Sequence, residues 1–171
     1  MDKSGTFQEE FVKNCCFRID ENLRMIELAV SKISEPQVWQ KPNESLNSVG
    51  NLILHLCGNM TQYGIATLRG TEDNRKREQE FQTSGRYDKS QLLRLLDQTV
   101  AEVKATIQAT STQRFLETKK VQSFELSGIG NCIHLVEHFS YHTGQIAFWV
   151  KYLIDDQLGF YDGVNLNITN E

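Results

Sequence analysis

The stretch of sequence that decides the fold is residues 131–154, NCIHLVEHFSYHTGQIAFWVKYLI. It contains no proline, and its apolar and histidine positions recur every three or four residues, which is the spacing of one face of an α-helix. That face carries Leu135, His138, His142, Ile146, Trp149 and Leu153. The pattern predicts a long helix over 131–154, with two histidines embedded among core positions.

Three further amphipathic patterns predict helices over 7–33, 48–69 and 89–109. Pro36 and Pro42 are the chain's two prolines and both lie between the first two patterns, so helix breakers are nearly absent elsewhere. Asp88, with Gln91 three residues later, is a typical helix start. We therefore predict an all-α fold, a four-helix bundle formed by residues 1–171 as a single domain, with long connections between helices two and three and between helices three and four. The apolar stripe of the first helix is Phe11, Cys15, Ile19, Leu23, Ile26, Val30 and Ile33, and that of the third is Leu92, Leu96, Val100, Val103 and Ile107.

The connections carry their own signals. The stretch from Thr71 to Tyr87 is polar, with mixed charges over 72–81, and its length indicates a crossover or a functional loop. Its charges either line a pocket or remain solvated. Residues 121–126 fit a short extended segment. Trp39 is expected to pack over one end of the bundle, and the tail is expected to lay Phe160 and Tyr161 on it.

Composition limits the function. The 171 residues carry a net charge of −4 and the pI is about 5.6, which argues against a nucleic-acid or membrane-surface partner. The sequence contains no apolar run long enough to span a bilayer and no secretory h-region at its start. We therefore expect a cytoplasmic protein whose cysteines are free thiols. These are Cys15, Cys16, Cys57 and Cys132.

The histidines are the feature that points to chemistry. A lone histidine among core positions is ordinarily a hydrogen-bonded core residue, but two buried imidazoles four residues apart each need a polar partner, and a shared metal ion satisfies both. His55 lies on a polar row of the second helix with Asn51, Asn59 and Gln62. If that row faces inward it lines a pocket, and if it faces water no three-histidine site forms. The spacing alone equally allows His134 to pair with His138.

The order of these motifs resembles the DinB/YfiT-like superfamily. The resemblance rests on Gly50-Asn-Leu-Ile-Leu-His55-Leu-x-Gly-Asn59, followed far downstream by His134-x-x-x-His138-x-x-x-His142-x-Gly144-Gln145. The segments 75–81 and 158–163 resemble a branch of that superfamily of unknown function, so the resemblance covers nearly the whole chain. It implies a four-helix bundle, often dimeric, with a divalent metal ion held by one histidine of the second helix and two of the fourth.

Carried over to this chain, the implied metal ligands are His55, His138 and His142. His134 is then structural or supports a ligand. Glu137 points about 100° away from His138 along the helix, and Cys57 lies nearly opposite His55, so neither is expected to be a ligand.

Three neutral imidazoles with open positions suit zinc or nickel. Such an ion activates a bound water for hydrolysis or lowers the pKa of a bound thiol. Members of the superfamily include transferases and isomerases that use low-molecular-weight thiols, so the resemblance implies a thiol-dependent S-transferase or a hydrolase acting on a small-molecule substrate. The catalytic residues stay unknown. Glu78, Glu80 and Glu137 are weak candidates for the base of a hydrolase.

The alternative is a non-enzymatic stress-response protein that binds a metal or small molecule as a dimer. A homodimer is expected in either case, because aromatic residues in or beside the connectors would be costly to expose. These aromatics are Trp39, Phe81, Phe160 and Tyr161.

Overall fold

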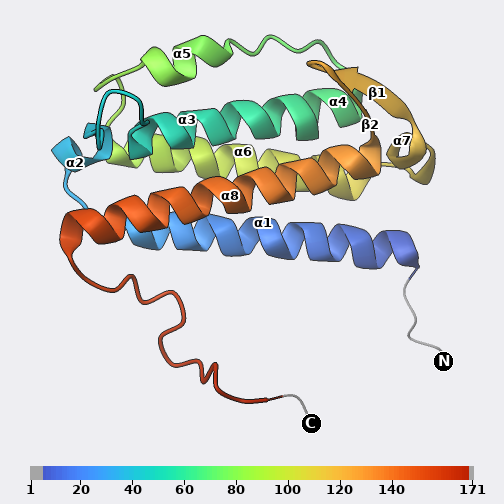
Figure 1. The fold of residues 1–171 in the computed structure, drawn as a ribbon. Coiled ribbons are helices and arrows are strands. Elements are labelled where there is room, and N and C mark those ends of the chain that lie inside the picture. The colour runs from blue at the N-terminus through green and yellow to red at the C-terminus, as the bar shows by residue number, and fades with distance from the viewer. Residues whose placement is uncertain (1–5, 170–171) are drawn as a thin grey trace.

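The computed structural model describes residues 6–169, and within that range four long helices form a bundle (Figure 1). They are α1 (Phe7–Ser31), α3 (Val49–Asn59), α6 (Lys89–Ala109) and α8 (Gly128–Ile154). Helix α3 continues through the π-helical segment η1 (Met60–Ala66) into α4 (Thr67–Arg69). The all-α bundle predicted from the sequence is confirmed, with a small β-hairpin added to it.

The predicted helix limits agree with the structure to within two residues except at the start of α8, which begins at Gly128 instead of Asn131. The Ser127 hydroxyl accepts a hydrogen bond from the Gly130 backbone N–H at 3.1 Å and caps this earlier start. Gly128 lies against the backbone of the preceding connector, where a Cβ would be 2.6 Å from the Arg114 carbonyl oxygen. The glycine therefore lets the helix begin directly at the connector.

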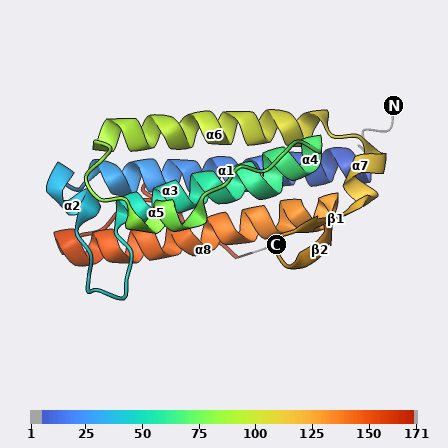
Figure 2. The same ribbon diagram turned by 90° about the horizontal axis from the view of Figure 1, so that it is seen from above.

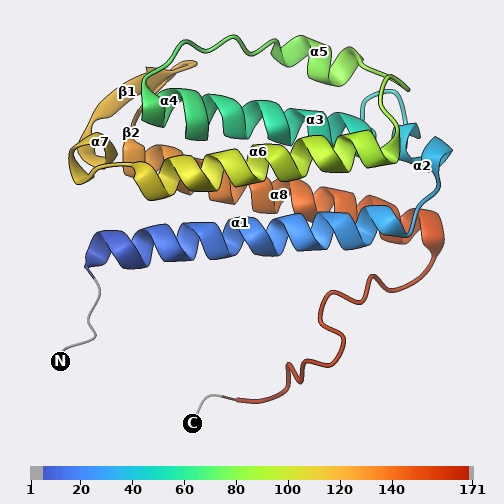
Figure 3. The ribbon, with the colours of Figure 1, turned by 180° about the vertical axis from the view of Figure 1, so that it is seen from behind.

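Helices α3 and α6 run parallel to each other. At one end of the bundle the Trp39 indole N–H donates to the Tyr87 carbonyl at 2.9 Å, which places the starts of both helices together. At the other end the Arg114 guanidinium lies beside Gly70, which places their ends together. Residues 71–87 must then carry the chain back along the bundle, as Figures 2 and 3 show. The long connection is the predicted crossover.

The apolar stripes meet in the core. Ile19 and Ile26 of α1, Leu92 of α6 and Leu135 of α8 are fully buried. Burial of such side chains contributes about 1.5–3 kcal/mol each relative to exposure, which makes these stripes the main stabilising feature of the bundle. Between residues 6 and 169, no helix is long and apolar enough to cross a membrane.

Short elements close the two ends of the bundle. At one end, α2 (Glu35–Trp39) is a helical turn that the sequence reading missed, although Pro36 in its first turn and the Ser34–Gln37 pair are ordinary start signals. At the other end, α7 (Thr112–Leu116) leads into the antiparallel strands β1 (Thr118–Val121) and β2 (Phe124–Ser127). The extended segment predicted over 121–126 covers the end of β1, the turn of this hairpin and most of β2. Gln122 lies in the turn and has a positive φ of 53°.

The crossover lies against α3 and carries the short helix α5 (Arg77–Gln82) (Figure 1). The side-chain amide of Asn51, which is fully buried, donates to the carbonyls of Glu80 at 2.9 Å and Thr83 at 2.7 Å. The C-terminal segment turns back from α8, and there Leu158 is buried while Phe160 packs on the core. The expected packing of Trp39 and Phe160 on the bundle is confirmed, whereas Tyr161, expected to pack with Phe160, is exposed.

Candidate metal centre

Three of the four histidines meet between α3 and α8. His55 comes from α3, and His138 and His142 come from successive turns of α8. His55 Nε2 lies 2.9 Å from His138 Nε2, and one ring nitrogen of each of the three lies within 4.8 Å of the other two. His55 and His142 are 5% and 9% exposed, whereas His138 is half-buried. The structure therefore brings together the three histidines that the family resemblance implied.

The polar row of the second helix faces inward. Asn51, Asn59 and Gln62 are all less than 10% exposed, like His55 between them. The row does not line an open pocket along its whole length. At its start the crossover covers it, because Asn51 donates hydrogen bonds to the Glu80 and Thr83 carbonyls. The alternative in which this row faces water is wrong, and its inward direction is what places His55 against α8.

Glu80 supports His55 from the crossover. His55 Nδ1 lies 2.9 Å from Glu80 Oε2, and Arg75 donates to both oxygens of the same carboxylate, at 2.8 Å through Nε and 2.9 Å through Nη2. The side chains of Arg75 and Glu80 are 4% and 11% exposed, so this is a buried, bidentate ion pair. Arg75 also donates to Gln62 at 2.9 Å, which ties the pair to the polar row. Part of the charged 72–81 segment therefore belongs to the site, while the rest is exposed.

The hydrogen bonds assign the protons on two of the rings. Burial would raise the pKa of Glu80, but hydrogen bonds from Arg75 and His55 outweigh it and hold that pKa below its ordinary value of 4.5. An ionised carboxylate only accepts, so His55 Nδ1 carries the hydrogen of this contact, and the tautomer of His55 that could bind a metal ion has its lone pair on Nε2. In the same way His142 Nδ1 donates to Gln145 Oε1 at 2.7 Å, which leaves its Nε2 as the lone-pair donor.

This donor set fits a divalent metal ion. Metal-bound histidines ordinarily donate their second ring nitrogen to a carboxylate or carbonyl oxygen, as His55 and His142 do here. Two neutral imidazole nitrogens 2.9 Å apart, as in His55 and His138, must share either a proton or a cation. Nitrogen ligands of one zinc ion lie at most about 4 Å apart, so the three rings would have to draw slightly closer together to hold one ion.

The surroundings keep His138 and His142 neutral. Burial, with the neighbouring His142 and His55, lowers the pKa of His138 to about 3. Burial likewise lowers the pKa of His142 to about 4, against the hydrogen bond that His142 donates to Gln145, which raises it. Neutral imidazole is the form that binds metal ions.

His134 lies beside the cluster and does not belong to it. Its ring packs against Tyr63, with centroids 4.1 Å apart, and stacks on His138 at 5.4 Å. Glu137 is exposed, and Cys57 lies in the apolar core. The expectations that His134 has a structural or supporting role and that the other two are not ligands agree with these positions.

Sequence reasoning missed Arg75, Gln145 and Gly58. Arg75 and Glu80 are five residues apart in an irregular segment, a spacing that carries no periodic signal. Gln145 was part of the quoted motif but had no role assigned to it. Gly58 did carry a signal, because a glycine inside a helix often marks a close approach. A Cβ at this position would overlap the Glu80 carboxylate and lie 2.9 Å from Arg75 Nε.

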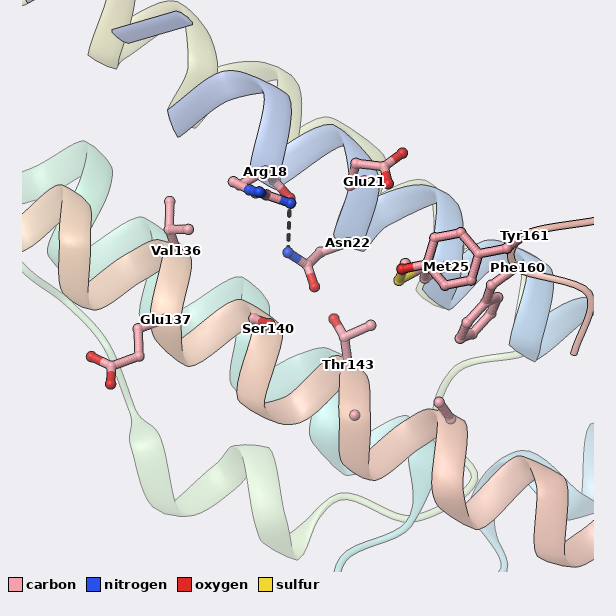
Figure 4. Close-up of a pocket in the computed structure, with 12 residues that line it drawn as sticks. Arg18, Glu21, Asn22, Met25, Val136, Glu137, Ser140, Thr143, Phe160 and Tyr161 are labelled. Carbon is pink, nitrogen blue, oxygen red and sulfur yellow. Dashed lines mark hydrogen bonds between the residues drawn. The ribbon is translucent and has the colours of Figure 1, made fainter. Parts of the chain in front are cut away.

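The histidines do not line either of two cavities in the described part of the chain. A cavity of about 480 Å³ lies between α1 and α8, on a different face of α8 from the histidines. Figure 4 shows Asn22 and Thr143 facing each other across it, with Phe160 and Tyr161 closing one end and Glu137 directed away. A second cavity of about 340 Å³ lies under the crossover, where Arg75 and Glu80 form part of its wall.

Comparison with solved structures confirms the fold. A DinB-like protein from Bacillus subtilis, YjoA, superimposes with a TM-score of 0.63 at 15% identity, covering 82% of this chain and 91% of that one. A DinB-like protein from Bacillus cereus gives a TM-score of 0.67 at 10% identity, covering 85% of this chain and 91% of that one. These likenesses confirm the predicted DinB-like architecture.

Sequence comparison identifies the family. No curated protein matches the chain. The sequence profile of DUF1572, described as a protein of unknown function, matches residues 6–161, which is nearly the whole chain. The chain therefore belongs to the DUF1572 family, within the DinB-like fold.

Proposed function

We propose that His55, His138 and His142 bind a divalent metal ion, zinc or nickel, and that the protein is a metal-dependent enzyme acting on a small molecule. The observation that carries the proposal is the convergence of three ring nitrogens, two of them on rings whose other nitrogen donates to Glu80 or Gln145. Three nitrogen ligands are typical of catalytic zinc, which keeps a position open for water or substrate.

The surroundings of the cluster favour thiol transfer over hydrolysis. Such an ion would supply either an activated water or a thiolate nucleophile. Hydrolysis would call for a general base, but Glu80 is held by Arg75 and His55, while Glu78 and Glu137 are exposed. A thiol needs only the lowered pKa that a bound metal gives it. We infer that a low-molecular-weight thiol is the small-molecule partner and that the reaction is an S-transfer.

A second candidate function follows from the cavities. Histidines line neither the cavity between α1 and α8 nor the one under the crossover, so neither gives a substrate direct access to the ring nitrogens. This favours, as the alternative, a non-enzymatic protein that binds a metal or small molecule. An enzyme keeps an exchangeable position on its metal, and a structural site does not.

Metal analysis of protein purified without an affinity tag or chelator tests the site. After incubation with Zn²⁺ or Ni²⁺ and removal of excess metal, we expect one ion per chain by elemental analysis. His138→Ala should abolish stoichiometric metal while circular dichroism keeps most of the helix signal, because the apolar stripes form a core of their own. His134→Ala is the matched control and should weaken binding far less. Full retention of metal by His138→Ala would refute the proposal.

Titration of the cobalt-loaded protein with small thiols separates the two candidates. A thiolate that binds Co²⁺ produces an intense near-ultraviolet charge-transfer band. We expect this band with small thiols, followed by turnover when an electrophilic acceptor is added. A loaded protein whose cobalt spectrum is unaffected by every thiol tried would favour the non-enzymatic alternative.

A further inference from the structure

A buried amide next to the histidine cluster has an unused hydrogen-bonding atom. Asn59 is 3% exposed, and its Oδ1 has no hydrogen-bond partner within residues 6–169. Its Nδ2 lies 3.4 Å from His134 Nε2. If the amide oxygen and nitrogen are exchanged, the oxygen faces His134 and the nitrogen is left over, so one polar atom remains unused in either orientation.

A second unused atom lies on the same side of α8. Asn131 is fully buried, and its Nδ2 donates to the Ser127 carbonyl at 2.9 Å and more weakly to that of Leu126. These bonds fix the orientation of the amide, and its Oδ1 is the other buried side-chain atom without a partner in the described part of the chain. Asn131 precedes His134 by three residues, which is one helical turn. The two amides therefore come from positions next to His134, Asn59 by contact from α3 and Asn131 by one turn of α8.

The position of His134 connects these amides to the candidate metal centre. Its ring stacks on His138, whose Nε2 lies 2.9 Å from that of His55. Asn59 follows His55 by four residues, so the two side chains leave α3 about 5–6 Å apart on one face. A small ligand bound through one end at the histidines would therefore have its other end near Asn59.

We propose that Asn59, together with His134 and Asn131, forms a polar subsite beside the three histidines and binds the hydroxyl group of a small ligand. Buried polar groups are ordinarily hydrogen-bonded, so an unused amide atom calls for a partner. A hydroxyl both donates and accepts, and it therefore satisfies Asn59 in either orientation of the amide. The inference rests on the proposed function, because the other end of the ligand binds the metal ion.

Two thiols of nearly equal size test the subsite. The cobalt-loaded protein is titrated with 2-mercaptoethanol and with 1-propanethiol, which differ by a hydroxyl in place of a methyl group, and the charge-transfer band gives each Kd. The proposal expects 2-mercaptoethanol to bind about fivefold more tightly. Asn59→Leu, which keeps the size of the side chain, should remove this preference while cobalt stoichiometry stays at one. Asn14→Leu, on the exposed face of α1, should leave the preference intact.

The outcomes separate the subsite from the metal centre. Failure of the wild-type protein to bind cobalt overturns the proposed function and the subsite with it. A charge-transfer band with equal affinities for the two thiols overturns the subsite alone and assigns the unused amide atoms to ordered water. If Asn59→Leu does not fold, the affinities of the two thiols are compared in Asn59→Ser and in the wild-type protein instead. A preference that survives in Asn59→Ser also overturns the assignment to Asn59.

Discussion

Glu80 illustrates how a single residue acquires its role from the fold. In the sequence it is one acid in a run of mixed charges. Nothing there distinguishes it from Glu78 or Glu137 as a candidate general base for hydrolysis. In the structure it accepts hydrogen bonds from His55 and Arg75, so its carboxylate orients a ring and is not free to take a proton from water. The ligand histidines were predictable because a helix repeats at a fixed interval. Their partners were not, because the crossover has no such repeat.

Glu80→Gln should weaken metal binding by about 10- to 100-fold, since the charge that aligns His55 and increases its basicity is lost. The affinity can be measured by competition with a coloured chelator. The wild-type and Glu80→Gln proteins should both be fully loaded with metal at the start. Glu78→Gln removes the same charge from an exposed position of the same short helix and should bind metal like the wild type. Equal affinities for the Glu80 and Glu78 variants would show that the orienting contact has no effect.

Among the elements, the four long helices were the easiest to predict, because each buries a periodic apolar stripe. Helix α2 and the hairpin were missed or only partly recognised, since elements of four or five residues are too short to show a period. The close contact between α3 and the crossover was also missed. It depends on Gly58, which leaves room for the Glu80 carboxylate where any other residue would place a Cβ.

Gly58→Ala should lower the free energy of unfolding of the metal-free protein by about 1–3 kcal/mol, because the new Cβ displaces a buried ion pair. Gly144→Ala is the matched control in α8. There a Cβ meets nothing within 4 Å, and the usual helix gain of about 0.5–1 kcal/mol should appear. Urea denaturation followed by circular dichroism measures both. Stabilisation of both variants would mean that the ion pair moves aside at no cost.

Across the whole molecule, the bundle and its crossover followed from the sequence, whereas the assembly did not. The prediction of a homodimer relied on four aromatics near the connectors. Tyr161 is exposed, but Trp39, Phe81 and Phe160 are half-buried within their own chain. Exposed aromatics lie instead along one face of α8, where Tyr141, Phe148 and Tyr152 are between 62% and 74% exposed. Their spacings of seven and four residues place them on one stripe.

We propose that this α8 stripe forms the homodimer contact, since large aromatic side chains clustered on one exposed helix face often mark an interface. Light scattering at micromolar concentration should then give twice the chain mass, and Phe148→Glu should shift it toward one chain. Phe17→Glu, at an exposed aromatic of α1, should leave the mass unchanged. A wild-type mass of a single chain would refute the dimer.

The thiols report on the core as a whole. All four cysteines are free and buried, and burial raises the pKa of Cys57 and Cys132 to about 12 and that of Cys15 to about 11. Thiolate is the reactive form, so the folded protein should react slowly with a disulfide reagent at pH 8. In denaturant without reductant, four thiols per chain should react at once. Two or fewer would mean that disulfides form, and would contradict the reducing, cytoplasmic setting that we propose.

The π-helical segment η1 has a consequence for chain length. The Thr67 backbone N–H donates to the Gln62 carbonyl, five residues back, so this stretch accommodates one residue more than an α-helical turn between the same end points. It is equivalent to a one-residue insertion, absorbed as a bulge that contains Gln62, the last residue of the polar row. Deleting one residue within 60–66 should restore an ordinary α-helix, with the residues beyond the bulge keeping their orientation relative to His55. Family members that lack the bulge should therefore be one residue shorter here, and they should present a different side chain where this chain has Tyr63.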